Sequence, residues 1–190
     1  IKLTGESYVV LDGITFTKNG SISLVDFKGN LTIINCKFVG VTVANAILAD
    51  EKSKFKLDVS RCYFSGGSVT NAISVKGELI SSTIVGNKFT SSFCSGQILD
   101  FSDSFGKTTV GISRNICEKP NLLSLSLKEN RECQYILSKN EFKTIDKPFV
   151  NVKLSSGTSF RNISISIDGT TMPARYVPIT LTTDIPKDKR

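Results

Sequence analysis

The segment INCKFVGVTVANAI (residues 34–47) is followed 26 residues later by a near copy, SRCYFSGGSVTNAI (residues 60–73). In each copy a cysteine stands two residues before a phenylalanine, a short break containing glycine follows, and Asn-Ala-Ile closes the match. Self-similarity at a regular spacing is the sequence signature of repeat architectures. The pair therefore raises two questions: whether a longer series exists, and whether the cysteines serve chemistry or packing.

The copies belong to a longer series when the phenylalanine is taken as an anchor and similar segments are sought on either side. Six anchors result, separated by 22, 26, 25, 28 and 25 residues: Phe16, Phe38, Phe64, Phe89, Cys117 and Phe142. An aliphatic residue stands five positions before every anchor: Leu11, Ile33, Val59, Ile84, Ile112 and Leu137. The position seven before the anchor is also mostly apolar, and this period of two predicts a strand with one buried face.

A second short strand is predicted after each anchor, and polar turn residues follow it. These second strands lie at residues 21–27, 45–50, 71–77, 96–102, 121–127 and 148–154. A unit of about 25 residues made only of short strands cannot bury its own apolar face, so successive units must stack on one another.

The predicted fold is therefore all-β: a parallel β-helix, or β-solenoid, of about six to seven coils, each about 4.8 Å above the last. Residues 1–158 would form the coils. Residues 159–190 would form a last partial coil and a C-terminal strand or tail that acts as a cap or as a donor strand. A sandwich or a propeller would need hairpins, and the chain lacks Asn-Gly or Asp-Gly turns set between alternating strands.

The Asn-x-Phe corner of the later units, followed by small residues, resembles the right-handed parallel β-helix of the pectate-lyase-like superfamily. Within it, NCKFVGVTVANAI and RCYFSGGSVTNAI are similar to repeats of polymorphic-membrane-protein-type surface adhesins, which pair a Phe/Asn motif with Gly-Gly-Ala-Ile. The resemblance covers about residues 7–155. It implies a right-handed coil and a secreted or cell-surface location. It also implies that an enzyme of this fold would cluster carboxylates on one face, often with Ca²⁺ and an Arg or Lys base.

In such a fold the corner residues face inward and stack on their equivalents in neighbouring coils. The anchors should form an aromatic stack, worth roughly 0.5–1.5 kcal/mol per contact beyond burial, from Phe16, Phe38, Phe64, Phe89 and Phe142. Two residues before the anchors, a structural ladder is expected from Cys36, Cys62, Asn87, Asn115 and Asn140. Buried amides are tolerated when they donate and accept hydrogen bonds along the axis.

The five cysteines show no Cys-x-x-Cys spacing, so a zinc cluster is not predicted. Stacked Cys36 and Cys62 would have Cα atoms about 4.8 Å apart, which a disulfide accepts. Their parallel side chains would strain that bond, and two buried thiols are the favoured interpretation. Cys94 and Cys133 lie in stretches expected to be loops, where either could reach a partner.

Catalysis is not predicted. The chain has no histidine, which removes Ser-His-Asp triads, Cys-His dyads and most metal sites. The best carboxylates follow the second strands and alternate with lysines, as solvated turns do: Asp26, Asp50, Glu51, Glu78, Asp100, Asp103 and Glu129. We therefore expect no catalytic residues, no metal and no cofactor.

The net charge of +7 comes from basic residues that are scattered singly along the sequence. This pattern favours a solvated surface with modest affinity for anionic polymers, and no nucleic-acid partner is predicted. No run of about 18 apolar residues exists, so no membrane span is predicted. Three sequons are candidates for glycosylation, at Asn19, Asn30 and Asn162. The chain opens on Ile and closes on Lys-Arg, which suits either a processed product or an arbitrary boundary.

Two functional hypotheses follow. The first is a non-enzymatic, extracellular structural or adhesive β-helix protein, a subunit or segment of a surface filament. Its expected partners are further copies joined end to end into a fibre, and glycans or host or cell-surface proteins. The alternative is a carbohydrate-active enzyme or glycan-binding module of the pectate-lyase-like class.

Overall fold

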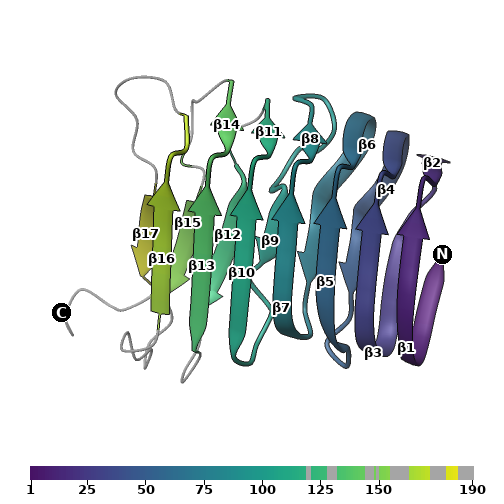
Figure 1. Cartoon of the computed structure of the whole chain (residues 1–190), viewed down its shortest axis with the longest axis horizontal. Helices are drawn as coiled ribbons and strands as arrows, with labels where there is room; N and C mark the ends of the chain where they lie inside the picture. The colour runs from purple at the N-terminus through teal and green to yellow at the C-terminus, as the bar shows by residue number, and fades with distance from the viewer. Residues whose placement is uncertain are drawn as a thin grey trace.

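The computed structural model describes residues 1–118, 121–127, 132–143, 148, 150–154, 163–171 and 179–183. These ranges contain strands and turns but no helix, and the strands join into one 17-stranded sheet in which every pairing recorded is parallel. The chain winds as a β-solenoid of about 6 turns of roughly 25 residues, which confirms the predicted fold class (Figure 1).

Each turn of the solenoid contributes to three faces. The front face consists of the carboxyl part of β1 (Lys2–Asp12), the carboxyl part of β3 (Ile22–Ile34), β5 (Lys54–Ser60), β7 (Glu78–Val85), β10 (Thr108–Ser113), β13 (Cys133–Ser138) and β16 (Ile163–Asp168). The anchor face consists of β2 (Thr15–Lys18), the amino parts of β4 (Lys37–Ala49) and β6 (Tyr63–Val75), β8 (Lys88–Phe89), β11 (Ile116–Cys117) and β14 (Glu141–Phe142). The return face consists of the remaining parts of β1, β3, β4 and β6 with β9 (Leu99–Phe101), β12 (Leu123–Leu127), β15 (Val150–Leu154) and β17 (Ile179–Thr183).

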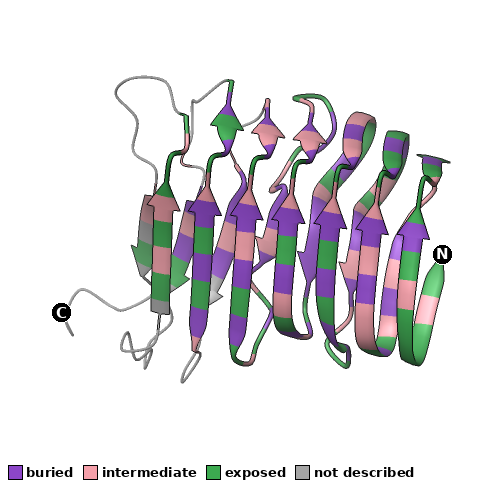
Figure 2. Cartoon of the chain, in the orientation of Figure 1, coloured by how far each residue is buried: buried purple, intermediate pink, exposed green. Residues whose placement is uncertain are grey.

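The aliphatic column predicted five residues before the anchors runs along the front face in unbroken register. Leu11 pairs with Ile33, Ile33 with Val59, and so on to Leu137, which pairs with Ile167. The front strands alternate between buried and exposed residues, as Figure 2 shows by their purple and green bands. The period of two in the sequence thus becomes one apolar face that lines the interior.

The glycine-containing breaks after the anchors do not interrupt the strands of the early turns. β4 and β6 each run from the anchor face to the return face, and Gly40 and Gly66 lie within them at φ 63° and 64°. Val39 pairs with Ser65 and Val41 with Gly67, so the pairing resumes directly beyond the bend. A left-handed residue turns the chain here without ending its pairing, so the glycine-containing break is a bend inside a strand.

Among the described residues, the front-face strands at the two ends of the solenoid are paired on one side only. On the front face β1 is paired with β3, and β16 is paired with β13. On the return face β17 continues the series through parallel pairing with β15, from Val150–Ile179 to Leu154–Thr183. The apolar residues that are only partly buried include Leu3, Val9 and Ile14 in the first turn and Ile165 and Ile167 in the last.

Candidate functional site

The anchor residues form a continuous column on the anchor face. The rings of Phe16 and Phe38 lie 4.5 Å apart at 5°, and those of Phe38 and Phe64 lie 4.8 Å apart at 4°. Phe64 and Phe89 follow at 4.6 Å and 16°. Cys117 then takes the next place in register and pairs with Phe142 beyond it. The stack of rings is therefore continuous through the first four turns and meets a thiol at the fifth.

The three asparagines of the later turns form a buried hydrogen-bonded ladder. Asn87 Nδ2 donates to the Val59 carbonyl at 2.9 Å and to Asn115 Oδ1 at 3.0 Å. Asn115 Nδ2 donates in the same way to Ile84 O and to Asn140 Oδ1, both at 2.9 Å. Each Oδ1 also accepts the backbone N–H of the rung before it, from Cys62 N at 2.8 Å onward. Every polar atom of the central amide is thus satisfied inside the protein.

The two cysteine rungs reproduce half of this pattern. Cys36 Sγ donates to Leu11 O at 3.4 Å and Cys62 Sγ to Ile33 O at 3.6 Å, in the same carbonyl column that the asparagines use. Each thiol also lies 3.3 Å from the carbonyl oxygen two residues before it. A thiol is a weak donor and a weak acceptor, so the rung is kept but its bonds are weaker.

All five cysteines are buried thiols. Burial raises the pKa of Cys62 from 9.0 to about 12, and burial also raises the pKa of Cys117. Because the nucleophile is the thiolate, these thiols are poorly suited to chemistry at neutral pH. The loops expected around Cys133 and Cys94 are not both observed: Cys133 begins β13, and Cys94 forms a parallel bridge with Val69. Both are part of the core.

A column that the sequence analysis did not identify lies between the front and anchor faces, three residues before each anchor. We call it the corner column; it has φ between 53° and 68° at Gly13, Asn35, Arg61, Gly86, Arg114, Lys139 and Gly169. Each corner N–H from Gly13 to Lys139 donates to the last front-face carbonyl of the next turn. Left-handed backbone is unfavourable by roughly 1–2 kcal/mol for residues other than glycine. The recurring Gly13, Gly86 and Gly169 were the available signal.

The carboxylates of the turns bond within their own turn or to a neighbouring turn, and they do not converge on one site. Asp50 accepts bonds from the N–H groups of Asp26 and Lys52 and from the Ser53 hydroxyl. Burial acts to raise the pKa of Asp50, but these hydrogen bonds outweigh it and lower the pKa. The other predicted acids differ in their partners: Asp100 accepts from Ser102 and Asn71, whereas Glu78 pairs with Lys54 at 3.0 Å. Glu129 lies outside the described residues.

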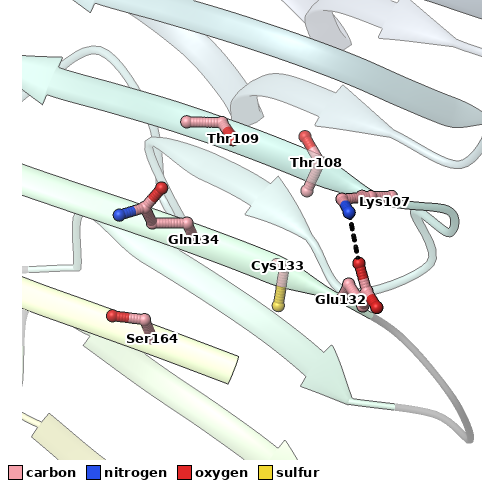
Figure 3. A pocket seen from close by; sticks show the side chains of 7 residues that line it. All are labelled: Lys107, Thr108, Thr109, Glu132, Cys133, Gln134 and Ser164. Atoms are coloured by element: carbon pink, nitrogen blue, oxygen red, sulfur yellow. Dashed lines mark ion pairs between the residues drawn. The ribbon is translucent and has the colours of Figure 1, made fainter. Parts of the chain in front are cut away.

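A shallow hollow of about 310 Å³ lies on the front face near the C-terminal end, lined by Lys107, Thr108, Thr109, Glu132, Cys133, Gln134 and Ser164. Figure 3 shows its side chains on three neighbouring strands, β10, β13 and β16 and the turns before them. Lys107 Nζ lies 2.6 Å from Glu132 Oε2, and this bond raises the pKa of Lys107. The cation and the acid neutralise each other, so the hollow offers hydroxyls and one amide to a polar ligand.

The sequons take different positions. Asn19 is exposed beside β2, Asn30 is half-buried within β3, and Asn162 lies outside the described residues. In the part of the chain that the structure describes, no group of three or more His, Cys, Asp or Glu side chains is placed to hold a metal ion. The same part holds no helix long and apolar enough to cross a membrane. No protein-family model matches the chain, and no curated protein or solved structure matches it either.

Proposed function

We propose that this chain is a non-enzymatic structural or adhesive rod of an extracellular or cell surface, and that it acts as a subunit or segment of a filament. The observation that carries the proposal is the match between the two ends of the solenoid. Val9 and Ile165 occupy one inward column, and Leu11 and Ile167 occupy the next. Leu11 is buried, whereas Val9, Ile165 and Ile167 are only partly buried against the core.

The match supports end-to-end stacking because, among the described residues, β1 is paired on one side only, with β3, and β16 on one side only, with β13, and both pairings are parallel. If β1 of a second copy pairs in parallel with β16, both apolar columns continue across the junction in register. Such stacking would bury apolar surface and satisfy strand-edge hydrogen bonds, which are the usual hazard of an uncapped sheet. Contacts of this head-to-tail kind do not close on themselves and generate fibres. Further coils of the same kind would continue the columns equally well.

The repeat resemblance to polymorphic-membrane-protein-type adhesins supports the surface location, and the exposed sequon at Asn19 suits a glycosylated protein. The recurrent residues of the repeat, namely the aliphatic columns, the rings and the ladder, are buried in the described coils. A coil built this way serves length and rigidity, and it leaves the outward positions free to vary for adhesion.

Electron microscopy and sedimentation over a concentration series test the proposal. The junction would place Asp12 one strand spacing from Asp168 of the neighbouring copy, since both belong to one outward column. These two carboxylates would repel each other across the junction. Added salt and the substitution Asp168→Asn should therefore lengthen the assemblies, whereas Asp58→Asn, which removes an exposed acid in mid-rod, should not. Ile165→Lys should shorten them, and Ile80→Lys, at an exposed position of β7 in mid-rod, should leave them unchanged.

Discrete short particles at every protein and salt concentration would overturn the filament proposal. Equal effects of the end variants and their mid-rod controls would also overturn it, because assembly would then not depend on the two ends.

A further inference from the structure

The corner column brings together basic residues that the sequence scatters. Arg61, Arg114 and Lys139 are separated by 53 and 25 residues, yet all three lie in one line along the edge between the front and anchor faces. With one strand spacing per turn, the Cα atoms of Arg61 and Arg114 lie about 9.6 Å apart, and those of Arg114 and Lys139 about 4.8 Å apart. All three side chains are exposed.

The side chains of this line extend along the solenoid axis. A Cβ placed on Gly86 would lie 3.9 Å from Arg61 Cγ, and one placed on Gly169 would lie 3.4 Å from Lys139 Cγ. The stems of Arg61 and Lys139 therefore lie beside the glycine of the following turn, where no side chain blocks them.

These cations have no acidic partner within the described part of the chain, where the ion pairs involve other residues. The neighbouring outward column adds the exposed Lys37 and the partly exposed Lys88, which pairs with Glu118 at 3.6 Å. It also contains one acid, Glu141, beside the turn of Lys139. The outward column on the other side of the ridge contains two exposed acids, Asp12 in its first position and Asp168 in its last. Glycine would take the left-handed backbone conformation at these positions at lower cost than Arg61, Arg114 and Lys139 do. Such local strain concentrates at functional positions.

We propose that this line, the basic ridge of Arg61, Arg114 and Lys139 with Lys37, binds a linear acidic polysaccharide along the axis of the rod. The ridge is long and narrow, which fits a single extended chain. Guanidinium groups pair bidentately with sulfate and carboxylate groups. Apart from Tyr63, which lies under the Lys88 ammonium at 5.8 Å, no aromatic side chain occupies the two columns, so the stacking platforms that single-stranded nucleic acids use are lacking.

The inference rests on the proposed function in placing the chain at a surface where such glycans occur. The test measures binding of the full chain to heparin, to desulfated heparin and to single-stranded DNA, each at several NaCl concentrations. Arg61→Gln/Arg114→Gln/Lys139→Gln is compared with Lys28→Gln/Lys56→Gln/Lys76→Gln, which removes exposed lysines elsewhere. Each triple variant lowers the net charge by three, from +7 to +4.

We expect the ridge variant to lose heparin affinity by about tenfold or more and the control by less than about threefold. Wild-type binding should weaken as salt rises and should fall when the sulfates are removed. Arg61→Lys/Arg114→Lys should lie between wild type and the ridge variant, because the charge stays and the fork is lost. Circular dichroism and thermal unfolding of each variant check that the coils remain intact.

Equal losses in both triple variants would overturn the proposal, since binding would then follow net charge alone. DNA binding that is tighter than heparin binding and depends on the ridge would also overturn it, as would absence of heparin binding at low salt. Electron microscopy distinguishes failure of the ridge proposal from failure of the filament proposal. The ridge variant should assemble as the wild type does, and heparin binding by a chain that never assembles would refute the filament alone.

Discussion

The cysteine rungs and the asparagine rungs occupy one column of the same solenoid but stabilise it differently. In the early turns, Cys36 and Cys62 make weak thiol bonds while the neighbouring rings stack without interruption from Phe16 to Phe89. In the later turns the rings meet Cys117, and the amides of Asn87, Asn115 and Asn140 bond from coil to coil. Axial order is thus maintained by rings in one half and by amides in the other.

The two devices differ in what their loss leaves behind. Removing a ring contact loses dispersion and stacking, whereas removing an amide leaves buried donors and acceptors without partners. The later turns should therefore depend more on single polar residues than the early turns do.

The largest expected effect is that of Asn115→Ala. The variant leaves the Asn87 N–H without its acceptor and removes the donor to Ile84 O, both in the buried ladder. We expect a loss of about 3 kcal/mol in the free energy of unfolding. Cys62→Ala, at the equivalent rung, should lose only about 1 kcal/mol. Urea unfolding of both variants measures this difference, and equal losses would show that the thiol and amide rungs contribute alike.

Sequence reasoning predicted the inward columns because each has a common chemical character. Aliphatic residues at a spacing of two, and rings at about 25 residues, report burial and stacking directly, and the register of β1 to β16 follows them. Cys36 and Cys62 were placed in the same column as the asparagines because they also stand two residues before an anchor.

The corner column could not be predicted in this way because its members share a backbone conformation and not a chemistry. Gly13, Asn35 and Arg61 have little in common except a positive φ. The hydrogen bonds of Asp50 were not predicted either. Its carboxylate accepts bonds from three groups in its own and the preceding turn, but its sequence context is the same as that of a solvated acid. The basic ridge follows from the corner column and was hidden with it.

The ring stack offers a second comparison, between Phe38 and Phe89. Phe38 stacks on a ring at each side, whereas Phe89 stacks on Phe64 and faces Cys117 in register on the other side. Phe38→Leu should lower the free energy of unfolding by about 2 kcal/mol, and Phe89→Leu should cost about 1 kcal/mol less than that. Thermal unfolding at neutral pH provides the measurement, and a larger loss for Phe89→Leu would contradict additive stacking.

The Cys62 rung should also make the stability of the chain sensitive to alkaline pH. The Cys62 thiol ionises near pH 9.0 when unfolded, but burial keeps it neutral up to about pH 12 in the folded chain. The contribution of the Cys62 thiol to the free energy of unfolding is therefore complete below pH 9 and is lost as the pH rises towards 12. Between pH 7 and pH 10 the wild type should lose about 1.4 kcal/mol more than Cys62→Asn. Matching pH profiles for the two proteins would show that Cys62 does not contribute.

Cys62→Asn at neutral pH gives the smallest expected effect and tests whether the ladder can be extended. An asparagine at this rung would place Oδ1 to accept the Cys36 N–H and Nδ2 to reach both Ile33 O and Asn87 Oδ1, as Asn87 does one turn later. We expect a gain of about 1 kcal/mol, because stronger neutral hydrogen bonds replace the thiol contacts. Cys94→Asn, at a buried position outside the ladder, serves as the control and should destabilise the chain. A loss of stability in Cys62→Asn would mean that the early coils, packed around their stacked rings, lack the room that the amide needs.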